Sequence, residues 1–282
     1  MLLWALIGLG VLVLALLGYW LFHITEGVYL GPSVVTLLYD WSAPRYDAIK
    51  GFSNADESWF LARPLLKRLA AVPQPLVLDV ATGTGRLPCA LLREAHFRGQ
   101  IVALDLAHRM LKQAVLKSER YADHILFLHQ DATLLPFPDA AFDAVTCLEA
   151  LEFLPHARRT LREMTRVLRP GGVLLTTNRC GWEARLFFGR SFTRPQMISL
   201  LKGMGLGGIT VQSWQQLYDL VWARKPGDLL RDRQPTPELS ALVRCPQCQS
   251  ATLHSEAVAL CCPNCGAIYP IEECIVALTK AT

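Results

Sequence analysis

The sequence carries little charge for its length, and the two signs nearly balance. Of 282 residues, 28 are basic and 24 acidic, so charged residues make up 18% and the formal net charge is +4. Apolar residues make up 52%. Disordered chains combine low hydrophobicity with high net charge, and chains that coat nucleic acid need a large basic surplus. The composition argues against both classes and predicts about two folded domains, at roughly 150 residues per domain.

One stretch near the N-terminus has no charge at all. No Asp, Glu, Lys or Arg occurs in Leu2–Phe22, and no basic residue precedes Arg45. As a helix this stretch would span about 31 Å, the thickness of a bilayer's hydrocarbon core. A secretory signal peptide has a basic start and small residues at its cleavage site, whereas bulky Tyr19 and Trp20 stand here. We predict an uncleaved single-pass transmembrane helix over residues 1–23; the alternatives are a signal peptide or a buried helix.

Residues 24–73 predict a connector followed by helices. Pro32 and Ser33 can start a short helix, and Asn54 can cap a second one that Pro64 should kink or divide. These helices either pack on the next domain or cover a ligand pocket.

Nine cysteines are too few for a disulfide scaffold of this length. Four of them form two CxxC pairs with 13 residues between the inner cysteines. The four are Cys245, Cys248, Cys262 and Cys265. Two such pairs at this spacing predict a structural Zn²⁺ on four thiolates, with iron or a redox disulfide as alternatives. We therefore predict a zinc ribbon over residues 244–282, preceded by a Pro-containing linker over 227–243.

Short apolar runs alternate with helical stretches over residues 74–226. The runs are Leu76–Ala81, Ile101–Leu106, Ile125–His129, Phe142–Leu148, Val173–Thr177, Ile209–Trp214 and Leu220–Ala223. Alternation of this kind predicts a parallel sheet with crossover helices. Too few residues separate the last two runs for a helical crossover, so they form an antiparallel pair. The predicted fold is α/β, a Rossmann-like doubly wound sheet with a terminal antiparallel strand.

A tight glycine turn follows the first run. Residues 79–86 read Asp-Val-Ala-Thr-Gly-Thr-Gly-Arg, and glycines there let the backbone approach a ligand closely. A dinucleotide fingerprint has a third small residue three positions after Gly85, where Pro88 stands. Pro88 and the antiparallel ending argue against a nicotinamide or flavin oxidoreductase.

Two carboxylates end the next two runs. Asp105 can accept hydrogen bonds from two ribose hydroxyls, and Asp131 can accept one from an adenine amine. Either could instead be a turn or helix-cap carboxylate.

Five ordered blocks of residues 40–225 resemble the class I S-adenosylmethionine (SAM) methyltransferases, above all the branch similar to ubiquinone/menaquinone C-methyltransferases. The blocks are Val77–Gly85, Ala103–Asp105, Gln130–Ala132 with Leu135–Asp139, Phe142–Val145 and Arg166–Gly172. The resemblance implies SAM as cofactor. The positions it implies for cofactor binding are Asp79, Ala81, Thr82, Gly83, Gly85, Asp105, Leu106, Asp131, Ala132 and Glu149.

The resemblance also implies a role for several positions. Gly83 and Gly85 would lie along the methionine part of SAM, and Asp79 near its ammonium group. The segment Tyr39–Tyr46 resembles a helix that folds over the SAM site. Ala81 departs from the family, which usually has glycine there, and we expect its small methyl group to be tolerated.

Catalytic residues are harder to name, because methyl transfer is an in-line displacement that needs mainly alignment, plus a base where the acceptor must lose a proton. Glu149 and His156, after the fourth run, are the candidate bases. An Asn-Pro-Pro-Tyr signature of amino-group methylation on DNA or glutamine is absent. The segment Arg179–Arg190 mixes aromatic and basic residues, and predicts a pocket wall, a membrane-touching lid or a buried loop.

The C-terminal segment resembles small zinc-ribbon proteins that bind and activate RNA and protein methyltransferases. From Arg244 onward it has two basic and three acidic residues, which gives nucleic acid little to hold. We therefore predict that the ribbon docks on the methyltransferase domain of its own chain.

Together these features predict a membrane-anchored, SAM-dependent methyltransferase with a structural zinc ribbon. SAM and reduced zinc thiolates belong to the cytosol, so the catalytic domain should face the cytoplasm. The membrane location suggests a lipophilic small-molecule or lipid-like acceptor. The alternatives are an RNA or protein methyltransferase, or a noncatalytic SAM-binding scaffold.

Overall fold

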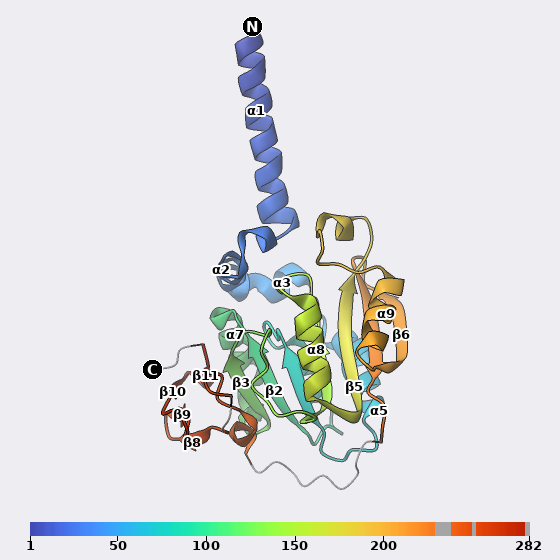
Figure 1. The fold of residues 1–282 in the computed structure, drawn as a ribbon, viewed down its shortest axis with the longest axis vertical. Coiled ribbons are helices and arrows are strands. Elements are labelled where there is room, and N and C mark those ends of the chain that lie inside the picture. Colours follow the sequence, from blue (N-terminus) through green and yellow to red (C-terminus); the bar gives the residue numbers. More distant parts are fainter. Residues whose placement is uncertain (229–237, 250–251, 280–282) are drawn as a thin grey trace.

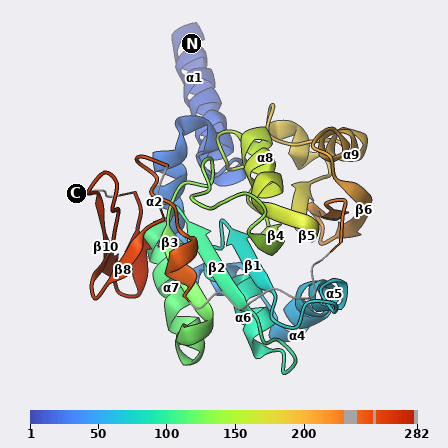
Figure 2. The same ribbon diagram turned by 60° about the horizontal axis from the view of Figure 1, so that its bottom comes forward.

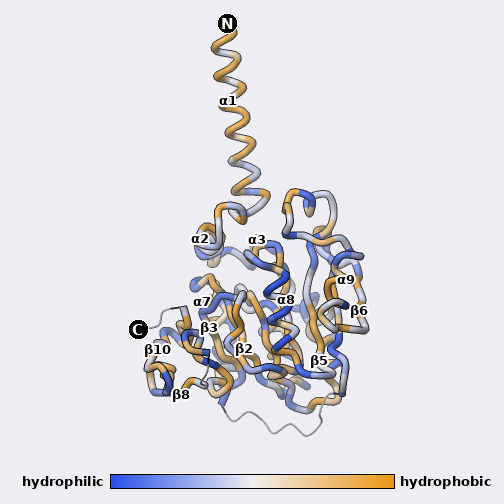
Figure 3. The backbone as a smooth tube through the Cα atoms, in the orientation of Figure 1, coloured by the Kyte–Doolittle hydropathy of each residue, from blue (hydrophilic) through white to orange (hydrophobic). Residues whose placement is uncertain are grey.

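A computed structural model of the chain describes residues 1–228, 238–249 and 252–279 (Figure 1). The first helix, α1 (Leu2–Tyr19), continues through a wider helical turn, Trp20–Ile24, and projects away from the rest of the protein. None of the residues of α1 is buried, and most of them are hydrophobic (Figure 3). By length and composition Leu2–Ile24 could cross a membrane, a property that N-terminal signal sequences share.

Short helices connect α1 to the sheet. They are α2 (Pro32–Ser42), α3 (Tyr46–Lys50), α4 (Asn54–Glu57) and α5 (Arg63–Arg68). Pro32 is the first residue of α2, where its missing N–H costs nothing. The cap predicted at Asn54 is wrong: Ser53 holds the cap position without a side-chain bond, and the Asn54 amide oxygen accepts from Arg93 instead. The predicted division at Pro64 is present, because a wider turn, Ser58–Ala62, separates α4 from α5.

Seven strands form the predicted sheet. They are β1 (Leu76–Val80), β2 (Gln100–Asp105), β3 (Ile125–His129), β4 (Phe142–Cys147), β5 (Leu168–Arg179), β6 (Gly207–Trp214) and β7 (Tyr218–Arg224). Their order is β6-β7-β5-β4-β1-β2-β3, with β1 to β5 parallel. The antiparallel strand is β7, which lies between β5 and β6 and is antiparallel to both. The predicted fold is confirmed, although the edge strand is β6 and the antiparallel strand lies one place inside it.

Helices cover both faces of this sheet (Figure 2). They are α6 (Arg86–Arg93), α7 (His108–Ser118), α8 (Ala157–Val167) and α9 (Arg194–Gly203). Successive residues of β1 belong to different clusters: Leu78 packs with residues of α8 and α9, and Val77 with residues of α5, α6 and α7. Strands buried on both faces read as continuous apolar runs, which is why they were visible in the sequence.

The C-terminal segment extends the sheet. Its strands are β8 (His254–Glu256), β9 (Ala259–Cys261), β10 (Ile268–Glu272) and β11 (Ile275–Ala277). Strand β11 pairs in parallel with β3, so that Ile275 lies opposite Phe127 and Val276 opposite Leu128. The Leu278 N–H donates to the His129 carbonyl at 3.1 Å. The C-terminal segment therefore covers what would otherwise be an open edge of the seven-stranded sheet.

Part of the predicted linker packs on the fold. Residues 229–237 of this linker lie outside the described part of the chain. Leu239–Leu242, within the predicted linker, forms a short helical turn, and Leu239 packs into the core shared with α8 and α9.

Candidate cofactor and acceptor site

The predicted cofactor residues meet at two adjoining cavities beyond the carboxyl ends of the strands. The larger cavity holds about 790 Å³ and is open to solvent; the smaller holds about 380 Å³. The predicted cofactor residues that line the larger cavity are Ala81, Gly83, Asp105, Leu106, Asp131, Ala132 and Glu149. Asp79 and Thr82 line the smaller one. Gly85 lines neither. The carboxyl edge of a doubly wound sheet is where such folds bind ligands.

The two glycines of the turn serve different purposes. Both have left-handed backbones, with φ of 55° at Gly83 and 76° at Gly85. A Cβ atom at Gly83 would meet nothing within 4 Å, whereas one at Gly85 would lie 3.0 Å from Cβ of Ala114 on α7. Gly83 thus leaves space open on the cavity side, while Gly85 permits close helix packing. Ala81 has φ of 54°, so its alanine adopts a conformation that costs on the order of 1 kcal/mol.

Asp105 connects the two loops that flank the cavity. One carboxylate oxygen accepts from the Gly83 N–H at 2.7 Å and the other from the Ala107 N–H at 2.8 Å. Burial raises the pKa of the Asp105 carboxyl, although these N–H donors oppose the shift. Each oxygen keeps a lone pair, so the carboxylate can still accept from a pair of ribose hydroxyls.

Asp131 stands two residues past the end of β3 and makes a local turn. Its Oδ1 accepts from the Thr133 N–H at 2.7 Å. The preceding Gln130 donates its N–H to the Asp105 carbonyl at 3.0 Å, which ties this loop to the end of β2. The turn role and an adenine-binding role are compatible, because only one oxygen takes part in this bond.

Asp79 is a buried carboxyl held by two hydroxyls. The Thr146 hydroxyl donates to Oδ1 at 2.5 Å and the Thr82 hydroxyl to Oδ2 at 2.7 Å. Burial raises the pKa of Asp79 to about 6, against the opposing effect of the two hydroxyl donors. This group therefore changes charge close to neutral pH, at the wall of the smaller cavity.

This pKa gives SAM binding an expected pH dependence. The SAM ammonium group favours the Asp79 carboxylate over its neutral form. As pH falls through 6, Asp79 takes up a proton in the free protein and SAM must displace it. Affinity should drop about tenfold between pH 7 and pH 5, as measured by isothermal titration calorimetry. Asp79→Asn should bind more weakly at pH 7 and show a flat profile; an unchanged slope in that variant would assign the effect to another group.

Glu149 lies at the junction of the two cavities and is held by cations. It is 7% exposed, has φ of 49°, and pairs with Arg86 through one oxygen and with Lys50 at 3.3 Å through the other. To accept a proton from an acceptor, Glu149 would first have to give up an ion pair. His156, the other candidate base, is exposed at the start of α8 and lines neither cavity.

Arg86 is a site residue that sequence reasoning left without a role. It pairs with Glu57 at 2.6 Å as well as with Glu149, and its guanidinium lies 4.1 Å from the Phe52 ring centroid and 4.8 Å from that of Trp214. A cation at the first position of a helix opposes the helix dipole and needs compensating anions. Its place at the start of α6 was the signal that could have revealed this cluster.

The far wall of the larger cavity is apolar and aromatic. Val35, Thr36 and Tyr39 come from one face of α2, Tyr46 from α3, and Phe153 from the loop after β4. The segment that was predicted to cover the SAM site thus lies over the cavity. Phe153 was not predicted to lie there.

The segment after β5 supports this wall from behind. The Phe187 ring lies 5.9 Å from that of Phe153, edge to face, and is buried. Trp182 and Phe188 on either side are exposed. None of these three lines either cavity, so the segment is not a pocket wall.

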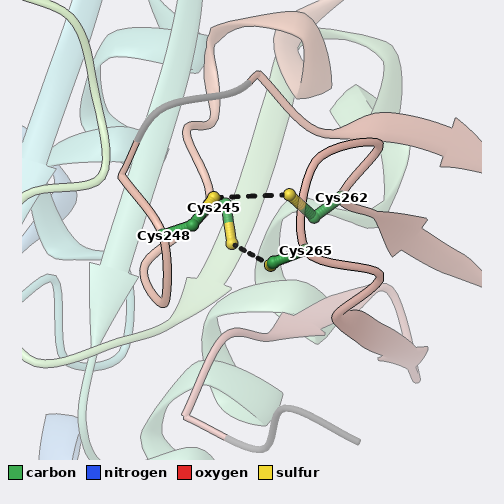
Figure 4. Close-up of side chains that lie close together, drawn as sticks. All are labelled: Cys245, Cys248, Cys262 and Cys265. Atoms are coloured by element: carbon green, nitrogen blue, oxygen red, sulfur yellow. Dashed lines mark hydrogen bonds between the residues drawn. The ribbon is translucent and has the colours of Figure 1, made fainter.

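The four predicted zinc ligands converge in the ribbon (Figure 4). Their sulfur atoms lie within 4.8 Å of one another, with Cys245 and Cys265 3.6 Å apart, and likewise Cys248 and Cys262. Tetrahedral zinc with Zn–S bonds of about 2.3 Å separates its sulfurs by about 3.8 Å. The Tyr269 hydroxyl lies 3.1 Å from the Cys245 sulfur, where it can donate to a thiolate. The arrangement fits a structural zinc ion.

Comparison with known proteins agrees with this geometry. Residues 78–176 match the methyltransferase domain family. The demethylmenaquinone methyltransferase of Thermus thermophilus is 39% identical over 135 residues, which are 47% of this chain and 60% of that protein. The ubiquinone/menaquinone biosynthesis C-methyltransferase of Shewanella frigidimarina is 34% identical over 135 residues, or 47% of this chain and 54% of that protein. The chain thus spans somewhat over half the length of these relatives.

A solved structure extends the likeness in fold. A chain in the complex that contains the Haloferax volcanii Trm112 methyltransferase activator matches with a TM-score of 0.53 and 22% identity, over 67% of this chain and 97% of that chain. Residues 78–176 are thus similar to methyltransferase domains, and the fold around them is that of class I SAM-dependent methyltransferases, as the five sequence blocks predicted. Within that class, the relatives named above are methyltransferases of quinone biosynthesis.

Proposed function

We propose that the protein is a membrane-anchored enzyme that transfers the methyl group of SAM to a lipophilic small molecule of the quinone type. The observation that carries the proposal is the position of α2. One face of this helix lines the cavity that holds Asp105 and Asp131, and the helix starts at Pro32, eight residues after the apolar helix ends at Ile24. The cavity is therefore tied through a short segment to a helix that could cross a bilayer.

SAM would divide between the two cavities. Asp131 and Asp105 would hold its adenine and ribose, and Asp79 and Glu149 would lie near its ammonium group. Bound there, SAM supplies a methyl group on a positive sulfonium. The chain's own contribution would be to align an acceptor against that methyl and to exclude water.

The apolar half of the larger cavity suits a flat lipophilic ring. Val35 and Phe153 offer apolar contact. Burial raises the pKa of the Tyr46 hydroxyl, so it stays protonated at neutral pH and can donate a hydrogen bond to an acceptor oxygen. The quinone relatives support an acceptor of this class.

We further propose that the ribbon binds zinc and acts as a built-in support of the methyltransferase domain. Its strand β11 completes the edge at β3, and its buried residues share a core with that domain. Its resemblance to methyltransferase activators supports this role. Because zinc thiolates and SAM both belong to a reducing compartment, the catalytic domain would face the cytoplasm.

An acceptor pair tests the proposal. The full chain in lipid vesicles would receive radiolabelled SAM and either a demethylated naphthoquinol with a long isoprenoid tail or the same ring without a tail. We expect label in the tailed quinol, no transfer by Asp105→Ala, and normal transfer by Asp123→Ala, which removes an exposed carboxylate away from the cavities. Faster transfer to the tailless ring would refute the membrane-delivered acceptor. Tight SAM binding without transfer to either quinol would favour a scaffold.

A further inference from the structure

The face of α2 that points away from the cavity is apolar and exposed. Val35 and Tyr39 line the cavity, whereas Leu37 and Trp41 are 68% and 76% exposed. At about 100° per residue, Leu37 and Trp41 project from the side of α2 opposite to the cavity. Large exposed apolar side chains that gather on one face mark contact sites for a partner, a ligand or a membrane.

This outer face is turned toward the foot of α1. Val34 packs against Gly27, which lies in the segment that joins α1 to α2. The contact is close: a Cβ atom at Gly27 would lie 2.8 Å from a Val34 methyl. Trp41 follows Val34 by seven residues and lies close to the same side of the helix. The exposed face of α2 is therefore continuous with the end of the apolar helix.

A second exposed apolar element lies on the other side of that foot. Trp182 and Phe188, in the segment after β5, are 67% and 66% exposed. The centroid of the Phe188 ring lies 6.3 Å from that of Trp20 and 6.4 Å from that of Tyr29. The Trp20 and Tyr29 rings stack on each other with their centroids 5.0 Å apart. Figure 1 shows α2 and the segment between β5 and α9 on either side of the lower end of α1.

Acidic side chains on these two elements, and Glu26 in the segment that joins α1 to α2, already have partners within the protein. Glu26 accepts from the Tyr39 hydroxyl at 2.8 Å, Asp40 from the Arg109 N–H at 2.7 Å, and Glu183 from Arg179 at 3.2 Å. Arg185 stands exposed between the two aromatic residues of the loop. Exposed aromatic and aliphatic side chains with basic neighbours are the pattern of segments that lie in the headgroup layer of a membrane.

We propose that Leu37, Trp41, Trp182 and Phe188 form a membrane-contact surface that sits in the headgroup layer of the bilayer that α1 crosses. This inference rests on the proposed membrane anchor and specifies how the domain is oriented. With this surface in the membrane, α2 lies between the lipid and the cavity, and a lipophilic acceptor reaches the cavity beside α2 without passing through bulk water.

Quenching of tryptophan fluorescence by brominated lipids tests the surface. The full chain would be placed in vesicles of phosphatidylcholine and phosphatidylglycerol, with bromine on the acyl chains close to the headgroups. Of the seven tryptophans, Trp41 and Trp182 should be quenched, together with Trp4 and Trp20 of the anchor. Removing either as Trp41→Phe or Trp182→Phe should lower the quenched fraction of the emission.

Trp59 provides the matched control. Its exposed fraction, 65%, is similar to those of Trp41 and Trp182. It lies in the turn Ser58–Ala62, which packs on α5 and α6, far from α1. Trp59→Phe should raise the quenched fraction, because it removes an unquenched residue. The surface is ruled out if Trp41→Phe and Trp182→Phe behave like Trp59→Phe.

Variants in the anchor separate the two proposals. Trp4→Phe and Trp20→Phe report whether α1 enters the bilayer. Quenching of Trp4 and Trp20 but not of Trp41 and Trp182 would leave the anchor standing and overturn the membrane-contact surface. Absence of quenching at all four would overturn both.

Discussion

Asp105→Ala is expected to weaken SAM binding at least about 100-fold. The carboxylate would lose two charge-assisted hydrogen bonds to ribose hydroxyls, worth about 1.5 kcal/mol or more each. It would also release the Gly83 and Ala107 N–H groups that it holds at 2.7 and 2.8 Å, so the loops on both sides of the cavity would lose their common partner. Calorimetric titration of the full chain with SAM measures the change.

The Asp105→Asn variant should show an intermediate loss of SAM affinity. Its amide keeps one acceptor oxygen but loses the charge, so its affinity should fall between those of the wild type and Asp105→Ala. Asp123→Ala should bind like the wild type. An Asp105→Ala protein that keeps its thermal stability and binds SAM within a few-fold of wild type would show that the ribose does not lie at the end of β2.

Cys262→Ser is expected to release zinc and to lower the unfolding temperature of the full chain by about 10 °C or more. The ribbon strands are only three to five residues long, and a unit this small rarely folds without its metal. Its loss would uncover the edge of β3 and the core that Tyr269 and Val276 share with the methyltransferase domain. Several kcal/mol of lost stability correspond to a shift of this size.

The neighbouring cysteine gives a matched control. Cys261 precedes Cys262 in the chain but is not one of the four clustered sulfurs. Cys261→Ser should therefore keep one zinc ion per chain, as measured by elemental analysis, and unfold at the wild-type temperature. Hydrogen exchange at the amides of β3 should speed up only in Cys262→Ser. Equal zinc content in the two variants would remove the metal site from the account.

The fold could be read from the sequence because its strands are buried on both faces and end in glycine and carboxylate signals at family spacing. Strand β5 illustrates the boundary of this reasoning. The run Val173–Thr177 was visible in the sequence, but β5 extends over Leu168–Arg179. The first part of the strand was missed because Pro170 and the two glycines after it are not typical of a strand. The place of β7 between β5 and β6 also depends on pairing between distant residues, which no local pattern encodes.

The site could be predicted where a single loop defines it and not where distant segments meet. Asp79 lies next to the end of β1, Asp105 ends β2 and Asp131 follows β3, so the sheet alone brings them to one edge. Arg86, by contrast, is held by Glu57 and Glu149, two residues that come from different parts of the chain. The sequence predicted that the ribbon docks on the methyltransferase domain. It did not indicate that the docking would take the form of β11 pairing with the edge strand β3.

The most direct test of the account follows the methyl group itself. The purified full chain would be incubated with radiolabelled SAM and with separated lipid, RNA and protein fractions of the host cell, beside Asp105→Ala. The account predicts label in the lipid fraction, with wild type only. Label in RNA or protein, or no transfer by a chain that binds SAM, would contradict it.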